Sequence, residues 1–126
     1  MVWQRTFSGT AELAHDARTF VGFLLTGLEQ RDDVVQAAGE LIANALTHTQ
    51  SGMPGGLYGV EVRRWNGGAA ITVTDQGGPG EPQVFTGELG EHGYGLLTVQ
   101  ALASWWDWSG NEQSRTVTAV FSRSHP

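Results

Sequence analysis

Glu40-Leu41-Ile42-Ala43-Asn44 is the segment around which this sequence is organised, and it lies inside a helical pattern over residues 34–49. Most positions of the pattern are apolar. The polar side chains recur every three to four residues, so they form one stripe on a helix. Glu40 and Asn44 are four residues apart and are therefore neighbours on this stripe. The stripe consists of Gln36, Glu40, Asn44, Thr47 and His48.

Two interpretations of this polar stripe are open. In the simpler one, it is the solvated face of an amphipathic helix. In the other, it carries chemistry, because a carboxylate such as Glu40 can act as a base and an amide oxygen such as that of Asn44 can bind a hard cation such as Mg²⁺. The segment alone favours the first interpretation, and the remaining motifs of the chain change that balance.

The composition of the 126-residue chain is that of a single packed domain. Hydrophobic residues make up 40%, with 5 Trp and 5 Phe, which argues against disorder. The absence of Cys excludes disulfides and cysteine metal sites and fits a reducing compartment. No signal peptide is visible, and no segment approaches the roughly 20 apolar residues of a membrane span. We therefore expect a cytoplasmic protein with no membrane partner.

The charge balance excludes further classes of protein. The formal net charge is -6, whereas nucleic-acid recognition requires a basic face, so we expect no nucleic-acid partner. All seven basic residues are Arg. Because the chain has no Lys, it has neither the P-loop lysine nor a Schiff-base lysine.

Hydrophobic periodicity predicts three helices and five strands. The helical patterns cover residues 13–28, 34–49 and 93–103, and the strand patterns cover residues 3–7, 58–63, 71–75, 105–108 and 116–121. Thr10 is expected to cap the first helix. Asp32 and Asp33 are expected to begin the second helix, where Asp33 and Gln36 resemble a capping box.

The order of these elements predicts the fold class. Asn66-Gly67-Gly68 lies between two strand patterns and has the composition of a hairpin turn. Short hairpins join antiparallel neighbours, and each strand shows one apolar face that needs covering. We expect an α+β two-layer sandwich, in which a mixed, mainly antiparallel sheet is covered on one face by three helices.

Asp75 continues the apolar row of a strand. Ile71, Val73 and Asp75 share one face, so the acid falls on the core side at the end of the strand. It could simply cap the turn Gln76-Gly77-Gly78-Pro79-Gly80. A partly buried carboxylate also requires hydrogen-bond donors, however, and a bound ligand could supply one.

Gly93-Tyr94-Gly95-Leu96 opens the third helical pattern. Glycines at a helix start allow the backbone to approach a ligand closely, and the unpaired N–H groups there suit a phosphate. Glycine pairs also occur at helix starts for packing alone. This motif is therefore informative only in combination with the other two.

In their order and spacing, the three motifs resemble those of the GHKL superfamily of ATP-binding domains, which carry the Bergerat nucleotide fold. The chain is most similar to the anti-sigma factor serine kinases of the RsbW type, which are histidine kinase-like ATPase domains. The resemblance covers nearly the whole chain and implies one such domain over residues 1–126. The matching segments are Glu40-Leu41-Ile42-Ala43-Asn44-Ala45, Asp75-Gln76-Gly77-Gly78 and Gly93-Tyr94-Gly95-Leu96-Leu97.

The resemblance implies a role for each matched residue, with ATP and Mg²⁺ as cofactors. Asn44 would be a ligand of Mg²⁺, and Glu40 would act as base or orienter for the attacking hydroxyl. Asp75 would accept a hydrogen bond from the adenine amino group, and Gly77 would let the backbone approach the base. The residues implied on the phosphate side, in the box that opens the third helix, are Gly93, Tyr94, Gly95 and Leu96.

The resemblance also implies an activity and partners. The chain would be an anti-sigma factor that phosphorylates Ser or Thr on an anti-anti-sigma partner of the STAS type. It would bind a sigma factor and could form a homodimer through its opening strand and helix.

An alternative is a nucleotide-binding regulatory module that has weak or no kinase activity and acts by protein contact. It is favoured by Pro79 where the family usually has glycine, by Tyr94 where many relatives have Arg, and by the acidic segment 81–91. A third interpretation is a two-layer domain with no ligand, against which the intact motif residues count.

Overall fold

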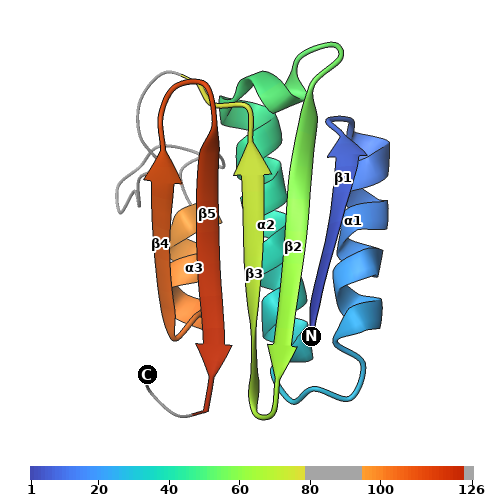
Figure 1. Cartoon of the computed structure of the whole chain (residues 1–126), viewed down its shortest axis with the longest axis vertical. Helices are drawn as coiled ribbons and strands as arrows, with labels where there is room; N and C mark the ends of the chain where they lie inside the picture. The colour runs from blue at the N-terminus through green and yellow to red at the C-terminus, as the bar shows by residue number, and fades with distance from the viewer. Residues whose placement is uncertain (79–94, 124–126) are drawn as a thin grey trace.

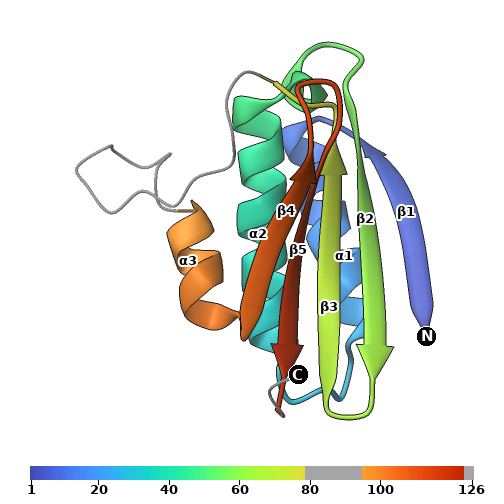
Figure 2. The same cartoon turned by 60° about the vertical axis from the view of Figure 1, so that its left-hand side comes forward.

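A five-stranded sheet with three helices on one of its faces makes up the part of the chain that the computed structural model describes, residues 1–78 and 95–123 (Figure 1). Figure 2 shows the helices on the same side of the sheet. The helices are α1 (Ala11–Leu24), α2 (Arg31–His48) and α3 (Gly95–Leu102), with a 3₁₀ turn over Gln50–Gly52. The strands are β1 (Val2–Ser8), β2 (Leu57–Trp65), β3 (Gly68–Asp75), β4 (Trp105–Gly110) and β5 (Arg115–Ser122).

The strand order is β1-β2-β3-β5-β4. All four pairings between described strands are antiparallel, so the predicted two-layer sandwich is confirmed and no parallel pairing is found among these strands. Two hairpins account for much of this pattern. Asn66 and Gly67 form the turn that connects β2 to β3, and Gly67 has a φ of +94°. Asn111 closes the β4–β5 turn, where its Oδ1 accepts from the N–H groups of Gln113 (2.9 Å) and Ser114 (3.1 Å).

The two faces of the sheet differ in polarity, as the alternation predicted. On the helix side of β3, Ile71 and Val73 are buried. On the other side, the hydroxyl of Thr72 lies 3.0 Å from that of Thr118 on β5, and a second threonine pair follows the same pattern. Because only the helix side is apolar, the core lies between the sheet and the helices.

Aromatic contacts attach the first strand and helix to this core. Phe7 of β1 stacks on Tyr58 of β2 with ring centroids 5.7 Å apart, and it meets Phe20 of α1 edge-on at 5.9 Å. Such pairs are worth about 0.5–1.5 kcal/mol beyond the burial of their area. β1 and α1 are therefore held to the sheet by side-chain packing in addition to backbone pairing.

Helix α1 begins as predicted and ends earlier. The hydroxyl of Thr10 accepts from the N–H of Leu13 at 3.4 Å, which confirms the predicted cap. The helix ends at Leu24, so Leu28 of the predicted stripe lies beyond it. The guanidinium of Arg64 on β2 donates to the carbonyls of Leu24 (3.0 Å) and Thr26 (2.8 Å). This contact from the sheet satisfies carbonyls at the end of the helix that have no partner within it.

Helix α2 begins at Arg31, one residue before the predicted start at Asp32 and Asp33, and the capping box was wrong. The N-cap is Gln30, which makes no side-chain capping hydrogen bond. Asp33 lies in the first turn, where a negative charge is favoured by the helix dipole. Nε of Arg31 donates to the carbonyl of Gly22 on α1 at 2.7 Å, so the first residue of α2 is attached to α1. No helix in the described residues is long and apolar enough to cross a membrane.

Candidate functional site

Helix α2 brings the described parts of all three motifs together. Glu40, midway along it, faces Gly95 at the start of α3. The other end of α2 lies beside the end of β3 (Figure 1), where the carbonyl of His48 approaches Gly78. The motifs are separated by many residues in sequence, yet they are placed along one helix.

The turn after β3 is held by hydrogen bonds to the segment that follows α2. Oδ1 of Asp75 accepts from the N–H of Gly77 at 2.7 Å, which confirms that Asp75 caps the turn. The carbonyl of Gly77 accepts from the N–H of Gln50 at 2.8 Å. The N–H of Gln76 donates to the hydroxyl of Ser51 at 2.9 Å. These hydrogen bonds join the turn to the segment that follows α2.

Gly77 is a position in this turn where both the backbone angle and the available space require glycine. Its φ is +75°, and a Cβ there would lie 2.1 Å from the carbonyl oxygen of Glu112 in the β4–β5 turn. We expect Gly77→Ala to lower the free energy of unfolding by more than about 1 kcal/mol in urea denaturation. Gly55→Ala is the matched control, because Gly55 has φ +80° with nothing within 4 Å of its Cβ position. Equal losses at both positions would contradict a cost from the Glu112 contact.

Asp75 is a buried acid beside a buried cation. Its exposed fraction is 6%, that of Arg115 is 4%, and Nε of Arg115 lies 3.9 Å from Oδ1 of Asp75. Burial raises the pKa of the Asp75 carboxyl, and the Gly77 N–H and the Arg115 guanidinium oppose that rise only in part. The ionised form of Asp75 therefore depends on these two neighbours.

Arg115 is a buried residue beside Asp75 that the sequence motifs did not indicate. A signal was present, because Arg115 falls in the same alternating row as Val117, Ala119 and Phe121, all of which are buried. It is also the partner of Asp75 in the β3–β5 register. Asp75 was noticed because a charged residue continues the apolar row of β3. Arg115 continues the apolar row of β5 in the same way.

Glu40 and Asn44 lie on the half-buried face of α2. A Cβ on Gly95 would lie 3.3 Å from Oε2 of Glu40, so the carboxylate is directed toward the start of α3. Asn44 follows one helical turn later. Leu96 is 4% exposed and belongs to the hydrophobic core. Gly93 and Tyr94 lie outside the described residues, as does Pro79.

The family model for the histidine kinase-like ATPase domain matches residues 7–121. The chain belongs to this family. No match was found among the curated proteins. The match confirms the family resemblance that the three motifs indicated.

Two solved structures share the fold of this chain. One is the structure of the RsbU and RsbW domains of Rv1364c from Mycobacterium tuberculosis, with 21% identity and a TM-score of 0.73 over 100% of this chain. This chain spans 33% of the length of that one. The other is the SiaB–SiaC complex from Pseudomonas aeruginosa, with 14% identity and a TM-score of 0.68 over 94% of this chain and 89% of that one. At these identities the likeness confirms the fold alone.

One hollow in this histidine kinase-like domain reaches Glu40 from the outer side of α2. Its volume is about 460 Å³. The stem of Arg18 on α1 forms one wall, because its Cδ lies 3.0 Å from the Cβ position of Gly39. The lining residues are Arg18, Asp32, Val35, Gln36, Gly39, Glu40 and Ala43. Glu40 thus borders both the start of α3 and an open surface.

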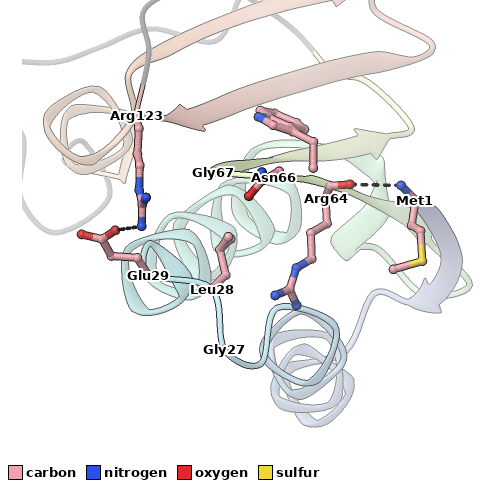
Figure 3. A pocket seen from close by; sticks show the side chains of 9 residues that line it. Met1, Gly27, Leu28, Glu29, Arg64, Asn66, Gly67 and Arg123 are labelled. Atoms are coloured by element: carbon pink, nitrogen blue, oxygen red, sulfur yellow. Dashed lines mark hydrogen bonds and ion pairs between the residues drawn. The ribbon is translucent and has the colours of Figure 1, made fainter.

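A second hollow, of about 420 Å³, lies at the opposite end of the sheet, beside the β2–β3 turn (Figure 3). Two of its charged side chains are engaged within the described chain. Arg123 forms an ion pair with Glu29, and Arg64 caps α1. This hollow is remote from the three motifs, and its charges serve the packing of the helix ends.

Proposed function

We propose that this chain is an ATP-dependent serine/threonine protein kinase that acts as an anti-sigma factor. Its substrate is a Ser or Thr of an anti-anti-sigma partner of the STAS type, and it also binds a sigma factor. The observation that carries the proposal is the direction of the Glu40 carboxylate toward Gly95 at the start of α3. The family resemblance implies that a base at this position would face the end of the nucleotide where transfer occurs. As an edge strand of the sheet, β1 supports the further proposal of a homodimer.

The protein side chains near Asn44 could hold Mg²⁺ only if most of its ligands came from the nucleotide. Among the described residues, no group of three or more His, Cys, Asp or Glu side chains could hold a metal. Mg²⁺ prefers oxygen ligands and commonly takes one or two from protein and the rest from phosphates and water. Asn44 supplies the amide oxygen. When bound, the ion neutralises charge on the phosphates.

The chain's own residues position the reactants. Phosphoryl transfer requires mainly alignment and charge stabilisation, and little covalent help from the protein. Glu40 accepts the proton of the attacking hydroxyl, which reaches it from the hollow on the outer side of α2. α3 begins at Gly95, and its first N–H groups face the phosphates. The family resemblance assigns Gly93, Tyr94 and Leu96 to the same side of the nucleotide.

The adenine base lies against the turn after β3. A carboxylate offers about four acceptor positions, and the Gly77 N–H occupies one on Asp75, so others remain for the adenine amino group. Gly77 has no side chain between the turn and the base. Asp75 recognises the base, while Glu40 and Asn44 act at the phosphates.

We expect Asp75→Asn to weaken ATP binding by roughly 10- to 100-fold, since a hydrogen bond to a charged group is worth about 1.5–3 kcal/mol. The new amide can also present a donor to the adenine amino group. Calorimetric titration with ATP measures the change, and a thermal melt checks that the variant is folded. Asp107→Asn is the control, because Asp107 is an exposed acid on β4. Unchanged ATP affinity in Asp75→Asn would remove Asp75 from the binding site.

A phosphorylation assay tests the proposed function. The STAS-domain proteins of the organism that encodes this chain are purified singly and incubated with the chain, Mg²⁺ and ATP labelled at the γ-phosphate. We expect one of them to be labelled on Ser or Thr. If the chain binds ATP and forms a complex with one of these proteins but labels none, the regulatory module without kinase activity is the correct interpretation. Pro79, Tyr94 and the acidic segment 81–91 favour that alternative.

A further inference from the structure

We propose that Arg115 is a positioning residue for nucleotide recognition, which holds the Asp75 carboxylate in the arrangement that accepts the base. The inference rests on the proposed function, because that function assigns the base to Asp75. Arg115 begins β5, whereas the described parts of the three motifs lie on α2, at the end of β3 and at the start of α3. Its position is fixed by the β3–β5 register, in which Arg115 is paired directly with Asp75.

The guanidinium of Arg115 extends under the turn that would receive the base. Its Nε lies 3.9 Å from Oδ1 of Asp75, and its Nη2 lies 3.2 Å from the position that a Cβ on Gly78 would occupy. One side chain therefore adjoins both the recognising acid and the glycine that follows Gly77. A movement of Arg115 would therefore change the charge beside both residues of the turn.

The distance between Nε and Oδ1 is too long for a hydrogen bond, so these two atoms interact through charge. That arrangement suits recognition, because Nε occupies no acceptor position on the carboxylate. A buried guanidinium that stabilises the anion from 3.9 Å leaves the oxygen atoms to ligand donors.

The ionisation state of Asp75 decides whether it can accept from adenine. A protonated carboxyl presents an O–H donor, which would oppose the donor on the adenine amino group. Burial raises the pKa of the Asp75 carboxyl, whereas Arg115 and the Gly77 N–H favour the ionised form. Without Arg115, the Gly77 N–H would be the remaining one of the two groups that favour the ionised form. The pKa of the Asp75 carboxyl would therefore rise further.

Other titratable groups near the turn meet it through their backbone. His48 at the end of α2 approaches Gly78 with its carbonyl oxygen, and Glu112 of the β4–β5 turn approaches Gly77 in the same way. The side chains of His48 and Glu112 are exposed. On β2, Tyr58 is buried, and the charges that act on its pKa are those of Arg18 and Asp16. Arg115 is thus the buried cation among the described residues that face Asp75.

A purely structural role for Arg115 is the competing explanation. Buried ion pairs are weak evidence for stability, since an apolar replacement of the whole pair is often neutral. A structural role and a recognition role also differ in what they predict. The first changes the stability of every variant, whereas the second changes how ATP affinity depends on pH.

The experiment measures ATP affinity across the acidic to neutral range in which the protein remains folded. Binding is lost as pH falls through the pKa of Asp75. In Arg115→Met, we expect the midpoint of this loss to move to higher pH, because the pKa of Asp75 rises. Arg115→Lys retains a cation and should restore the midpoint in part. Arg115→Gln is a second neutral variant in case Arg115→Met does not fold, and His48→Gln should leave the midpoint unchanged.

The outcomes separate this inference from the function on which it rests. Wild-type protein that binds no ATP would overturn both. Wild-type protein that binds ATP with the same pH midpoint as the folded neutral variants would overturn the role of Arg115 and leave the proposed function standing. A shifted midpoint in a neutral variant that Arg115→Lys partly restores is the result that supports it. Titration of the Asp75 carboxyl by ¹³C NMR without nucleotide should give pKa values that rank the variants in the same order as the pH midpoints of ATP binding.

Discussion

Glu40→Gln is expected to lower phosphoryl transfer to the STAS-type partner by roughly 10²–10⁴-fold, the usual worth of a positioned base, while ATP still binds. The substitution retains the shape of the side chain and its capacity for hydrogen bonding, and it removes the basic carboxylate. Because Glu40 is directed toward Gly95 at the start of α3, the loss should affect transfer and spare nucleotide affinity. Single-turnover transfer of labelled phosphate, alongside calorimetric titration with ATP, measures both quantities.

Asp33→Asn is the matched control for Glu40→Gln. Asp33 is exposed in the first turn of α2 and does not line the hollow beside Glu40, so the loss of its charge should leave transfer unchanged. Transfer that is equally rapid in Glu40→Gln and wild type would mean that Glu40 belongs to a solvated helix face. That result would return the stripe to the simpler of its two interpretations.

Asn44→Ala is expected to abolish the effect of Mg²⁺ on ATP binding and to reduce transfer to background. Asn44 is the proposed protein ligand of the ion, and the described residues contain no cluster of acidic and histidine side chains to replace it. Titration with ATP in the presence and absence of Mg²⁺ measures the effect. Asn44→Asp retains an oxygen ligand and should preserve much of the dependence on Mg²⁺. An undiminished response to Mg²⁺ in Asn44→Ala would exclude Asn44 as a ligand.

The elements of the fold were predictable where a local pattern determined them. The alternation of Ile71, Val73 and Asp75 correctly predicted which face of β3 is buried, since side chains alternate strictly along a strand. Gly67 in the β2–β3 turn was equally predictable, because the turn places it at positive φ. These features depend on neighbouring residues and on little else.

The start of α2 was predictable to within a residue, whereas its cap was not. The helix begins at Arg31 with Gln30 as the N-cap, so Asp33 lies inside the first turn and is not the capping residue. The side chain of Arg31 donates to the carbonyl of Gly22 on α1, a contact between two helices that a local sequence pattern cannot express.

The candidate site was predictable in its motifs and only partly in its neighbours. Family resemblance selected Glu40, Asn44 and Asp75, but only the packing of α3 against α2 brings Gly95 to Glu40. Arg115 was missed because its pairing with Asp75 depends on the register of two strands that are distant in sequence. An arginine at a strand end is ordinarily exposed, so its burial is a property of the assembled sheet.

Calorimetric titration of the wild-type chain with ATP, in the presence and absence of Mg²⁺, tests most directly whether the three motifs form a nucleotide site. We predict saturable binding of one ATP per chain, which Mg²⁺ tightens, accompanied by a rise in melting temperature because the ligand binds the folded state. An absence of both binding heat and thermal shift at millimolar ATP would contradict the account.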